Sequence, residues 1–373
     1  MKMTTKPIGL YVHIPFCVRK CNYCDFCSFP VDAIGGGMRE KYLQALAEEI
    51  RSYKREAVIA VDTVFFGGGT PSLLEPNELE LIMNAIRESF SVLPDAEITL
   101  EANPGTISAD NLRAYRGLGV NRLSIGLQSI HENELKILGR IHDYPTFLDG
   151  YRLAREAGFD NVSVDLMYGI PEQTIETFAE TLDAVISLKP EHISAYGLIV
   201  EAGTPFYTRR DELDLPSEDT ECDMYELACE RLCAAGYSHY EISNYARPDR
   251  QSRHNLHYWC DEEYVGVGVS AYSYFGGVRY SDPDSLSDYL STDFTRTIDS
   301  SDPEFEYAML ALRLSEGLSL TEYEARFSRS FTDGRAEKLA RYVAGGYMHQ
   351  RGDRIAFTER GFYVSNAILA DLL

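Results

Sequence analysis

Four cysteines lie close together near the start of the chain, and their spacing suits a metal centre. Cys17, Cys21, Cys24 and Cys27 fall within eleven residues in the pattern C-x3-C-x2-C-x2-C. Thiolates are soft ligands that bind zinc or iron–sulfur clusters. The alternative to a cluster is a structural zinc ion bound by all four cysteines, but zinc sites usually use C-x2-C pairs separated by a longer segment. Aromatic residues interleaved with these cysteines favour a cluster shielded from water.

A second group of polar residues follows predicted strands further along the chain. In a parallel βα fold, ligands bind at the carboxyl ends of the strands, so residues that end neighbouring strands share one site. Each position alone also has an ordinary explanation, such as a solvated carboxylate or a loop cap, and the signal is their joint placement. The positions are Gly67–Pro71, Glu101, Ser124–Gln128, Asp165, Gly169 and Tyr196–Gly197.

Strand and helix patterns alternate through the first two hundred residues and would position those side chains. Such alternation predicts βαβ units and a parallel sheet. Six strands are too few for a standard eight-stranded barrel, which leaves a partial barrel or a doubly wound sheet. The predicted strands are 8–13, 61–66, 98–102, 122–127, 161–166 and 192–196, and the predicted helices are 39–55, 78–90, 109–117, 144–157 and 175–188.

The pattern changes after about residue 200, which predicts three parts with the bounds 1–200, 201–302 and 303–373. Residues 201–216 are predicted as a loop, 217–235 as a helix and 237–245 as a strand, whereas 246–302 are hard to assign. The last part resembles a small winged-helix module with a strand near Arg354–Thr358. Its charges nearly balance, which favours a packing domain over DNA binding.

Composition excludes several classes of function. The 373 residues include 35 Lys and Arg against 58 Asp and Glu, a net charge of −23, so we expect neither a nucleic-acid partner nor an anionic membrane surface. No apolar stretch approaches the length of a transmembrane helix. The amino-terminal residues are predicted as a first strand rather than a signal peptide, which indicates a cytoplasmic protein with reduced thiols. The oligomeric state stays open, with a homodimer as one option.

The C-x3-C-x2-C spacing after a first strand is that of the radical S-adenosylmethionine (SAM) superfamily, which this chain resembles. The resemblance implies that Cys17, Cys21 and Cys24 hold three irons of a 4Fe–4S cluster and that SAM chelates the open fourth iron. Cys27 as a fourth ligand would close the cluster, so we expect it to be a non-ligand. The resemblance further implies a partial parallel (β/α)6 barrel with a smaller α+β C-terminal domain.

Within that superfamily the chain is similar to the oxygen-independent coproporphyrinogen III oxidase family over about residues 7–370. The resemblance implies two SAM sites. The planar fork of an arginine suits a carboxylate such as that of SAM. The implied contacts are Tyr11, Gly68 and Glu101 to the cluster-bound SAM, and Tyr23, Gly69, Thr70, Gln128, Arg140 and Asp165 to the second SAM.

Two subgroups share this scaffold. The oxidases carry C-x3-C-x2-C-x-C, whereas the spacing to Cys27 here is x2. The other subgroup, the heme chaperones, carries H-N-x-x-Y-W, which is present as residues 254–259 and includes the only tryptophan, Trp259. Neutral imidazole is a usual axial ligand of heme iron, so His254 is the predicted heme ligand. Cysteine ligation of the heme also stays open.

We therefore predict a heme chaperone that binds a SAM-ligated 4Fe–4S cluster and passes heme to an acceptor hemoprotein. Two alternatives remain. One is an oxygen-independent coproporphyrinogen III oxidase that uses a 5′-deoxyadenosyl radical for oxidative decarboxylation. The other is a zinc-stabilised scaffold protein.

Overall fold

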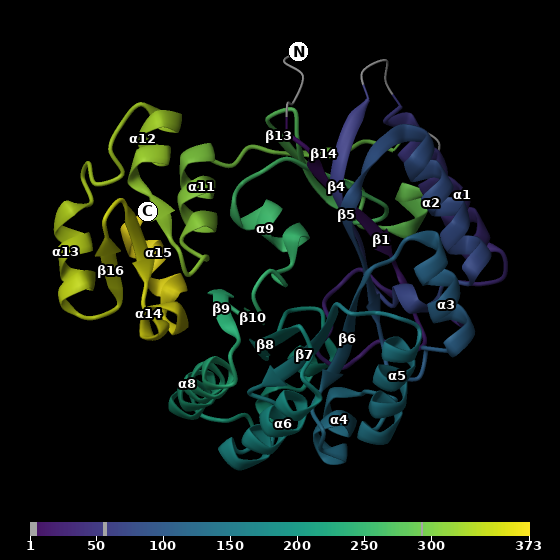
Figure 1. Cartoon of the computed structure of the whole chain (residues 1–373), viewed down its shortest axis with the longest axis horizontal. Coiled ribbons are helices and arrows are strands. Elements are labelled where there is room, and N and C mark those ends of the chain that lie inside the picture. The colour runs from purple at the N-terminus through teal and green to yellow at the C-terminus, as the bar shows by residue number, and fades with distance from the viewer. Residues whose placement is uncertain (1–5, 55–57, 292–293) are drawn as a thin grey trace.

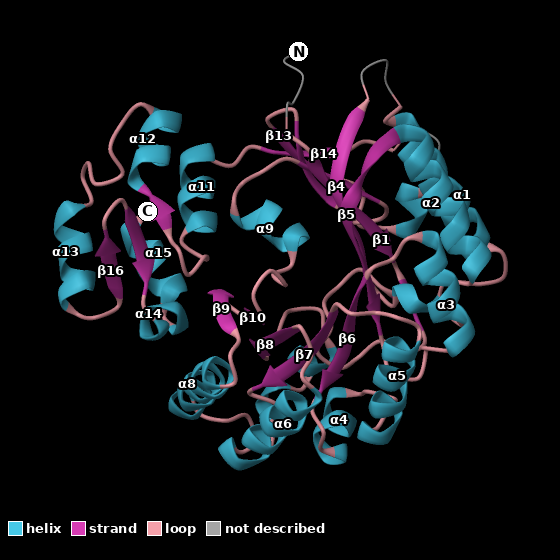
Figure 2. Cartoon of the chain, viewed as in Figure 1, coloured by secondary structure: helices cyan, strands magenta, loops and turns pink. Residues whose placement is uncertain are grey.

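The computed structural model describes residues 6–54, 58–291 and 294–373. Its main feature is a twelve-stranded sheet whose middle consists of parallel strands (Figure 1, Figure 2). Antiparallel strands extend both edges, with β12 (Tyr272–Phe275), β13 (Val278–Ser281) and β14 (Thr297–Asp299) on one side and β10 (Asn244–Ala246) and β9 (Ser238–Glu241) on the other. The parallel strands, in spatial order, are β11 (Tyr264–Val267), β1 (Ile8–Ile14), β4 (Ile59–Gly68), β5 (Phe90–Ala102), β6 (Arg122–Gln128), β7 (Val162–Tyr168) and β8 (His192–Gly197).

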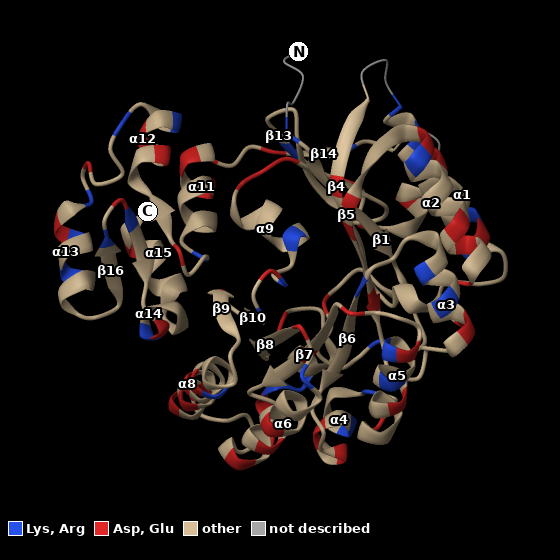
Figure 3. Ribbon diagram, viewed as in Figure 1, with Lys and Arg blue, Asp and Glu red and all other residues tan. Residues whose placement is uncertain are grey.

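Amphipathic helices cover the outer face of these strands (Figure 1). In α6 (Ile175–Leu188), Thr174 caps the first turn, and Phe178 and Leu182 are fully buried. Burial of each such side chain contributes about 1.5–3 kcal/mol. Acidic residues mark the exposed helices, including the first turn of α8 (Glu218–Ala234; Figure 3). The other helices are α1 (Met38–Ser52), α2 (Pro76–Ser89), α3 (Ala109–Leu118), α4 (Glu132–Leu138), α5 (Tyr144–Glu156) and α8 (Glu218–Ala234).

The six predicted strands and their intervening helices are all present, and the parallel (β/α)6 arrangement confirms the partial-barrel expectation. Strand β11 was not predicted; it lies in the unassigned stretch and pairs in parallel with β1 through Leu10 and Val265. Four residues are too few to show a strand periodicity. The predicted loop 201–216 was wrong in part, because it contains the short helices α7 (Pro205–Thr208) and η2 (Arg210–Glu212).

The last part of the chain forms a small α+β module beside the barrel (Figure 1). Its strands β15 (Leu318–Ser319), β17 (Arg354–Phe357) and β16 (Met348–Arg351) form a separate sheet in that order. With the helices, the chain order is helix, strand, two helices and a hairpin, as in a winged-helix module. One final helix was predicted, and the structure has two in its place, α14 (Glu359–Tyr363) and α15 (Ser365–Leu372). The module's first three helices are α11 (Pro303–Ala311), α12 (Leu320–Phe327) and α13 (Ala336–Ala344).

The inner face of the strands is polar, because alternate residues point inward while apolar residues face the helices. At the amino ends of the strands, Glu97, Arg122 and His192 are buried together with Thr63 and Ser163. Helix α9 (Arg253–Trp259) lies on this inner side and closes the amino end, with its first-turn amide at His254 donating to Glu97 at 3.2 Å. A ligand site is therefore expected at the carboxyl ends of the strands, which α9 does not cover.

Arg122 tests the importance of this buried polar layer. Its guanidinium Nε lies 3.9 Å from the Glu97 carboxylate, and both side chains are almost inaccessible to water. We expect Arg122→Ala to lower the free energy of unfolding by about 3–5 kcal/mol, because the carboxylate stays buried without its counter-charge. Denaturant unfolding of Arg122→Ala, Glu97→Ala and the double variant measures the coupling. Strictly additive losses would contradict this pairing.

Candidate functional site

A cavity opens at the carboxyl ends of the parallel strands. It brings together the cysteine loop and residues that end five neighbouring strands, as the positions of the polar residues predicted. The lining residues used below are Cys17, Cys21, Tyr23, Cys24, Gly68, Gly69, Thr70, Glu101, Asn103, Ser124, Gly126, Gln128, Arg140, Asp165 and Tyr196.

The cysteine loop is closed at its base by two short parallel strands, β2 (Phe16–Cys17) and β3 (Phe29–Pro30). Cys17, Cys21 and Cys24 line the cavity as free thiols. Burial raises the pKa of the Cys17 thiol and raises that of Cys24 to about 11. The Cys17 and Cys24 thiols therefore stay protonated at neutral pH until a positive centre, such as iron, stabilises the thiolate.

Cys27 is separated from the other three. Its Sγ lies 3.4 Å from the carbonyl oxygen of Asp284, on the segment after β13, and it does not line the cavity. Its own carbonyl oxygen contacts the His13 ring at 2.8 Å. This placement supports the expectation that Cys27 is not a cluster ligand.

The donor set fits a cluster held by three thiolates. Within the described ranges, no group of three or more His, Cys, Asp or Glu side chains surrounds the position of one metal ion. The three cysteines share one cavity wall and face polar groups that could chelate a small ligand.

The glycine turn after β4 seals against the cysteine loop. The amide of Gly69 donates to the Ile14 carbonyl at 2.8 Å, and that of Thr70 donates to the Phe16 carbonyl at 2.7 Å. A Cβ on Gly69 would lie 2.7 Å from the Phe16 carbonyl oxygen. Gly68 has a φ of 109°, and a Cβ there would meet the His13 ring at 2.5 Å. Both glycines are required for this approach.

Two buried carboxyl groups face the cavity. Burial, together with the nearby Asp165, raises the pKa of Glu101 to about 7, although the Gly68 amide donates to Glu101 at 3.1 Å. Burial also raises the pKa of Asp165, against the hydrogen bond that Ser124 donates at 3.0 Å. Buried carboxyl groups with raised pKa values are suited to binding a cationic ligand, because a nearby positive charge favours their ionised form.

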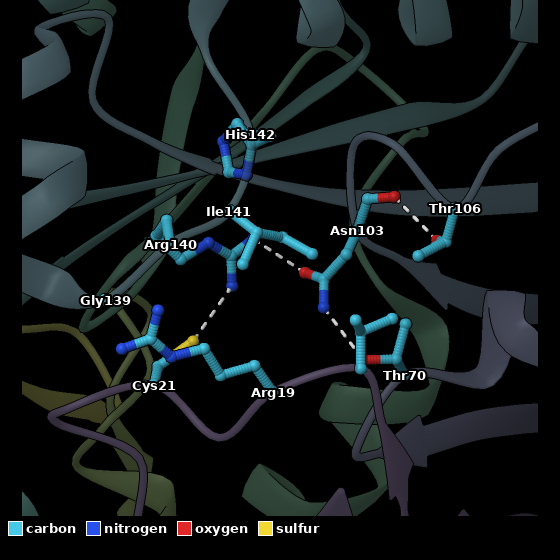
Figure 4. Close-up of a pocket in the computed structure, with 10 residues that line it drawn as sticks. Arg19, Cys21, Thr70, Asn103, Thr106, Gly139, Arg140, Ile141 and His142 are labelled. Atoms are coloured by element: carbon cyan, nitrogen blue, oxygen red, sulfur yellow. Dashed lines mark hydrogen bonds between the residues drawn. The ribbon is translucent and has the colours of Figure 1, made fainter. Parts of the chain in front are cut away.

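Arg140 lines the cavity and is held by contacts to two other segments. Its Nη2 donates to the Gly126 carbonyl at 2.6 Å, and its Nη1 lies 3.6 Å from the Cys21 sulfur (Figure 4). Gln128 has a positive φ of 72°, unusual for a residue with a side chain, and its amide oxygen accepts from the Tyr196 hydroxyl at 2.9 Å. Tyr23 lines the same cavity as Cys21 and Arg140.

Tyr11 is the implied SAM residue that does not line the cavity. Its hydroxyl contacts His13 Nδ1 at 3.0 Å, and its ring stacks on Phe65. Conversely, Asn103 lines the cavity and was not predicted as a site residue. The signal was its position two residues after Glu101, since alternate residues at a strand end share a face.

Comparison with known proteins agrees with this geometry. The radical SAM superfamily profile matches residues 11–185, and the HemN C-terminal domain profile matches residues 298–364. The heme chaperone HemW of Lactococcus lactis is 35% identical and that of Escherichia coli 36% identical, with alignments that span 100% and 97% of this chain and 98% and 97% of those proteins. The chain belongs to the HemW family.

Among solved structures, the HemW-family chain is similar to the coproporphyrinogen III oxidase HemN from Escherichia coli, described as a radical SAM enzyme. The TM-score is 0.83 at 27% sequence identity, over 98% of this chain and 89% of that one. The radical SAM fold and the C-terminal domain expected from the sequence are thus shown. No helix in the described part of the chain is long and apolar enough to span a membrane.

The H-N-x-x-Y-W motif of the HemW-family chain lies on α9, at the opposite end of the strands from the cavity. Both ring nitrogens of His254 are engaged, Nδ1 with Thr63 at 2.8 Å and Nε2 with Tyr258 at 2.7 Å. Burial, helped by His257, lowers the pKa of His254 to about 3, so the ring is neutral. The structure places His254 beside Tyr11, on whose ring it stacks, but away from the predicted site residues that line the cavity.

The separation of Cys27 predicts distinct outcomes for single cysteine variants. We expect Cys17→Ala, Cys21→Ala and Cys24→Ala to lose the cluster, because each removes a thiolate from the cavity wall. Cys27→Ala, the matched control, should keep it. Iron content and visible absorption after anaerobic reconstitution measure this. Cluster loss in Cys27→Ala with retention in Cys21→Ala would overturn the assignment.

The raised pKa of Glu101 predicts pH-dependent SAM binding. Only the ionised carboxylate can accept hydrogen bonds from a cationic ligand at both oxygens, and its population rises as the pH passes about 7. We expect the SAM affinity of cluster-loaded protein to rise about tenfold from pH 6 to pH 8. Glu101→Gln should bind SAM weakly and without this dependence, with unchanged iron. Calorimetry gives the affinities, with the exposed Glu132→Gln as control, and a pH dependence retained in Glu101→Gln would contradict the assignment.

Proposed function

We propose that this chain is a cytoplasmic heme chaperone, which holds a SAM-ligated 4Fe–4S cluster, binds heme and passes it to an acceptor hemoprotein. The observation that carries the cofactor assignment is the three-to-one division of the cysteine loop. Cys17, Cys21 and Cys24 face one polar cavity, and Cys27 faces the Asp284 carbonyl. The heme function is supported by relatives named heme chaperone that align along nearly the whole chain.

Each group at the cavity has a role in holding the cofactors. Cys17, Cys21 and Cys24 would bind three irons, and Glu101 and Asp165 would accept hydrogen bonds from the cationic and hydroxyl parts of SAM. Arg140 offers its remaining guanidinium hydrogens to a carboxylate. When bound, the cluster and SAM supply one-electron chemistry. The protein's part is to orient these groups and to exclude water from them.

The heme contact we propose is the outer end of α9 rather than His254. Coordination by His254 would require breaking its contacts to Thr63 and Tyr258 inside the barrel. Trp259 and Cys260 instead line a cleft of about 980 Å³ between α9 and the C-terminal module. The indole nitrogen of Trp259 has no hydrogen-bond partner in the described structure, and the Cys260 thiol is free.

The cleft has features that suit a large amphiphilic ring. Its lining includes the apolar or aromatic residues Ile8, Leu314 and Tyr307, and Arg326 and Arg354 provide cations for carboxylate side groups. Acidic residues also line it, and Arg326 already pairs with Asp261 at 2.5 Å. A dicarboxylate would compete with these existing pairs, so the affinity should be moderate. Moderate affinity suits a protein that must release its cargo.

The second candidate is a coproporphyrinogen III oxidase, favoured by the similarity to the HemN structure. The x2 spacing to Cys27 departs from the oxidase pattern of the cysteine loop. The higher sequence identity is to the heme chaperones. We therefore rank it second.

Heme titration tests where heme binds. We expect Trp259→Ala to weaken heme binding, because the cleft loses its largest aromatic surface. Trp259→Phe, the matched control, should retain most of the affinity, and His254→Ala should bind heme as the wild type does. The Soret band reports binding, and circular dichroism checks folding. Loss of the band in folded His254→Ala would restore His254 as the ligand.

A turnover assay separates the two functions. Wild-type protein receives coproporphyrinogen III, SAM and a reductant without oxygen, and the products are searched for protoporphyrinogen. We expect none, together with heme transfer to an apo-hemoprotein. Efficient decarboxylation would place the oxidase function first.

A further inference from the structure

A chain of hydrogen bonds joins two of the three cavity thiols through the wall of the cavity, and Figure 4 shows its part from Cys21 to Thr70. The Thr70 hydroxyl lies 3.5 Å from the Cys17 sulfur, and the Asn103 amide nitrogen lies 2.8 Å from the Thr70 hydroxyl. The Asn103 amide oxygen lies 2.6 Å from Arg140 Nη2, and Arg140 Nη1 lies 3.6 Å from the Cys21 sulfur. We call Thr70, Asn103 and Arg140 the thiol bridge.

The direction of every hydrogen bond in the thiol bridge follows from Arg140. A guanidinium can only donate, so it must face the amide oxygen of Asn103. The amide nitrogen of Asn103 then faces Thr70 and donates to its hydroxyl oxygen. The Thr70 hydrogen is left to point at the Cys17 sulfur. Asn103 thus presents donors to both thiols, although it touches neither.

The surrounding backbone holds the thiol bridge in place. The Gly126 carbonyl accepts from Arg140 at 2.6 Å, and a Cβ on Gly126 would lie only 3.1 Å from the guanidinium. The Asn103 amide of the main chain donates to Ser72 at 3.2 Å, and Thr106 donates to the Asn103 carbonyl at 2.7 Å. Asn103 is therefore fixed at both its backbone and its side chain.

We propose that Asn103 is a positioning residue that orients Thr70 and Arg140 as donors to the cluster thiolates and so raises the reduction potential of the cluster. This inference rests on the proposed cluster at Cys17, Cys21 and Cys24. Hydrogen bonds and positive charge at ligand sulfurs stabilise the reduced, more negative state of an iron–sulfur cluster. Asn103 orients both donors at once, because its side-chain nitrogen bonds to Thr70 and its side-chain oxygen bonds to Arg140.

Two substitutions at Asn103 have different consequences. Asn103→Ala removes the partner of both donors, so Thr70 and Arg140 lose their fixed direction. Asn103→Asp keeps an acceptor for Arg140 but attracts the Thr70 hydroxyl away from Cys17, because a carboxylate has no donor. It also adds a negative charge near the cluster. We expect both variants to lower the reduction potential, with Asn103→Asp the lower of the two.

The experiment is an anaerobic redox titration of the reconstituted full-length protein, followed by electron paramagnetic resonance of the reduced cluster. Iron content and circular dichroism are measured beside it. Ile141→Ala is the matched control, since Ile141 lines the adjoining pocket that the thiol bridge also borders, is 56% exposed and lies outside the thiol bridge. The control should keep the wild-type potential and spectrum. Asn103→Ser, which retains a short polar side chain, replaces Asn103→Ala if the latter fails to fold.

The outcomes separate the inference from the function on which it rests. A lowered potential and altered spectrum in the Asn103 variants, at wild-type iron content, support the thiol bridge. Wild-type potential and spectrum in folded, cluster-loaded Asn103→Asp would overturn it and leave the cluster assignment standing. A wild-type protein that holds no iron–sulfur cluster would overturn the cluster assignment and this inference together.

Discussion

The parallel pairing of β1 with β4 is the constraint on which the site depends. It runs in register to Ile14 and Gly68. It continues beyond the strands through the Gly69 and Thr70 amides, which bond to the Ile14 and Phe16 carbonyls. This extension fixes the start of the cysteine loop against the glycine turn. The thiol of Cys17 and the hydroxyl of Thr70 then meet because their backbones are already joined.

The outward face of the strands stabilises the fold, and the inward face carries the polar groups of the site. The outward residues of β1, such as Leu10 and Val12, are fully buried against the helices. The inward residues of the same sheet include Glu97, Glu101, Arg122 and Asp165, and placing such polar groups inside the barrel costs free energy. The helix-facing core stabilises the fold by enough to offset this cost. Without that core, a polar interior of this kind would not stay closed to water.

Much of this arrangement could be predicted from the sequence, because strand residues alternate. The run from Arg122 to Gln128 places polar or small residues at every second position, which gives both the strand and its inward face. The polar ends of six strands could therefore be predicted from the sequence. The cysteine spacing likewise indicated the cofactor class, and the structure adds that Cys27 turns away.

What could not be predicted depends on contacts between distant segments. β11 has only four residues and is defined by its neighbour β1. The motif on α9 shows which residues are present but not which of them face inward, and His254 proved to face the barrel. Asn103 became part of the site only through Thr70 and Arg140, which lie 33 and 37 residues away along the chain.

Helix α9 also fixes how the two ends of the protein can communicate. It fills the amino end of the strand interior, while the cysteines stand at the carboxyl end. The seven residues of β1 span about 20 Å at roughly 3.3 Å per residue. A group bound outside α9 is thus insulated from the cysteine loop by packed side chains. A line of contacts between them runs from the His254 ring to Tyr11, from Tyr11 to His13 and from His13 to the Cys27 carbonyl oxygen, so a shift of α9 would reach the cysteine loop through these packed rings.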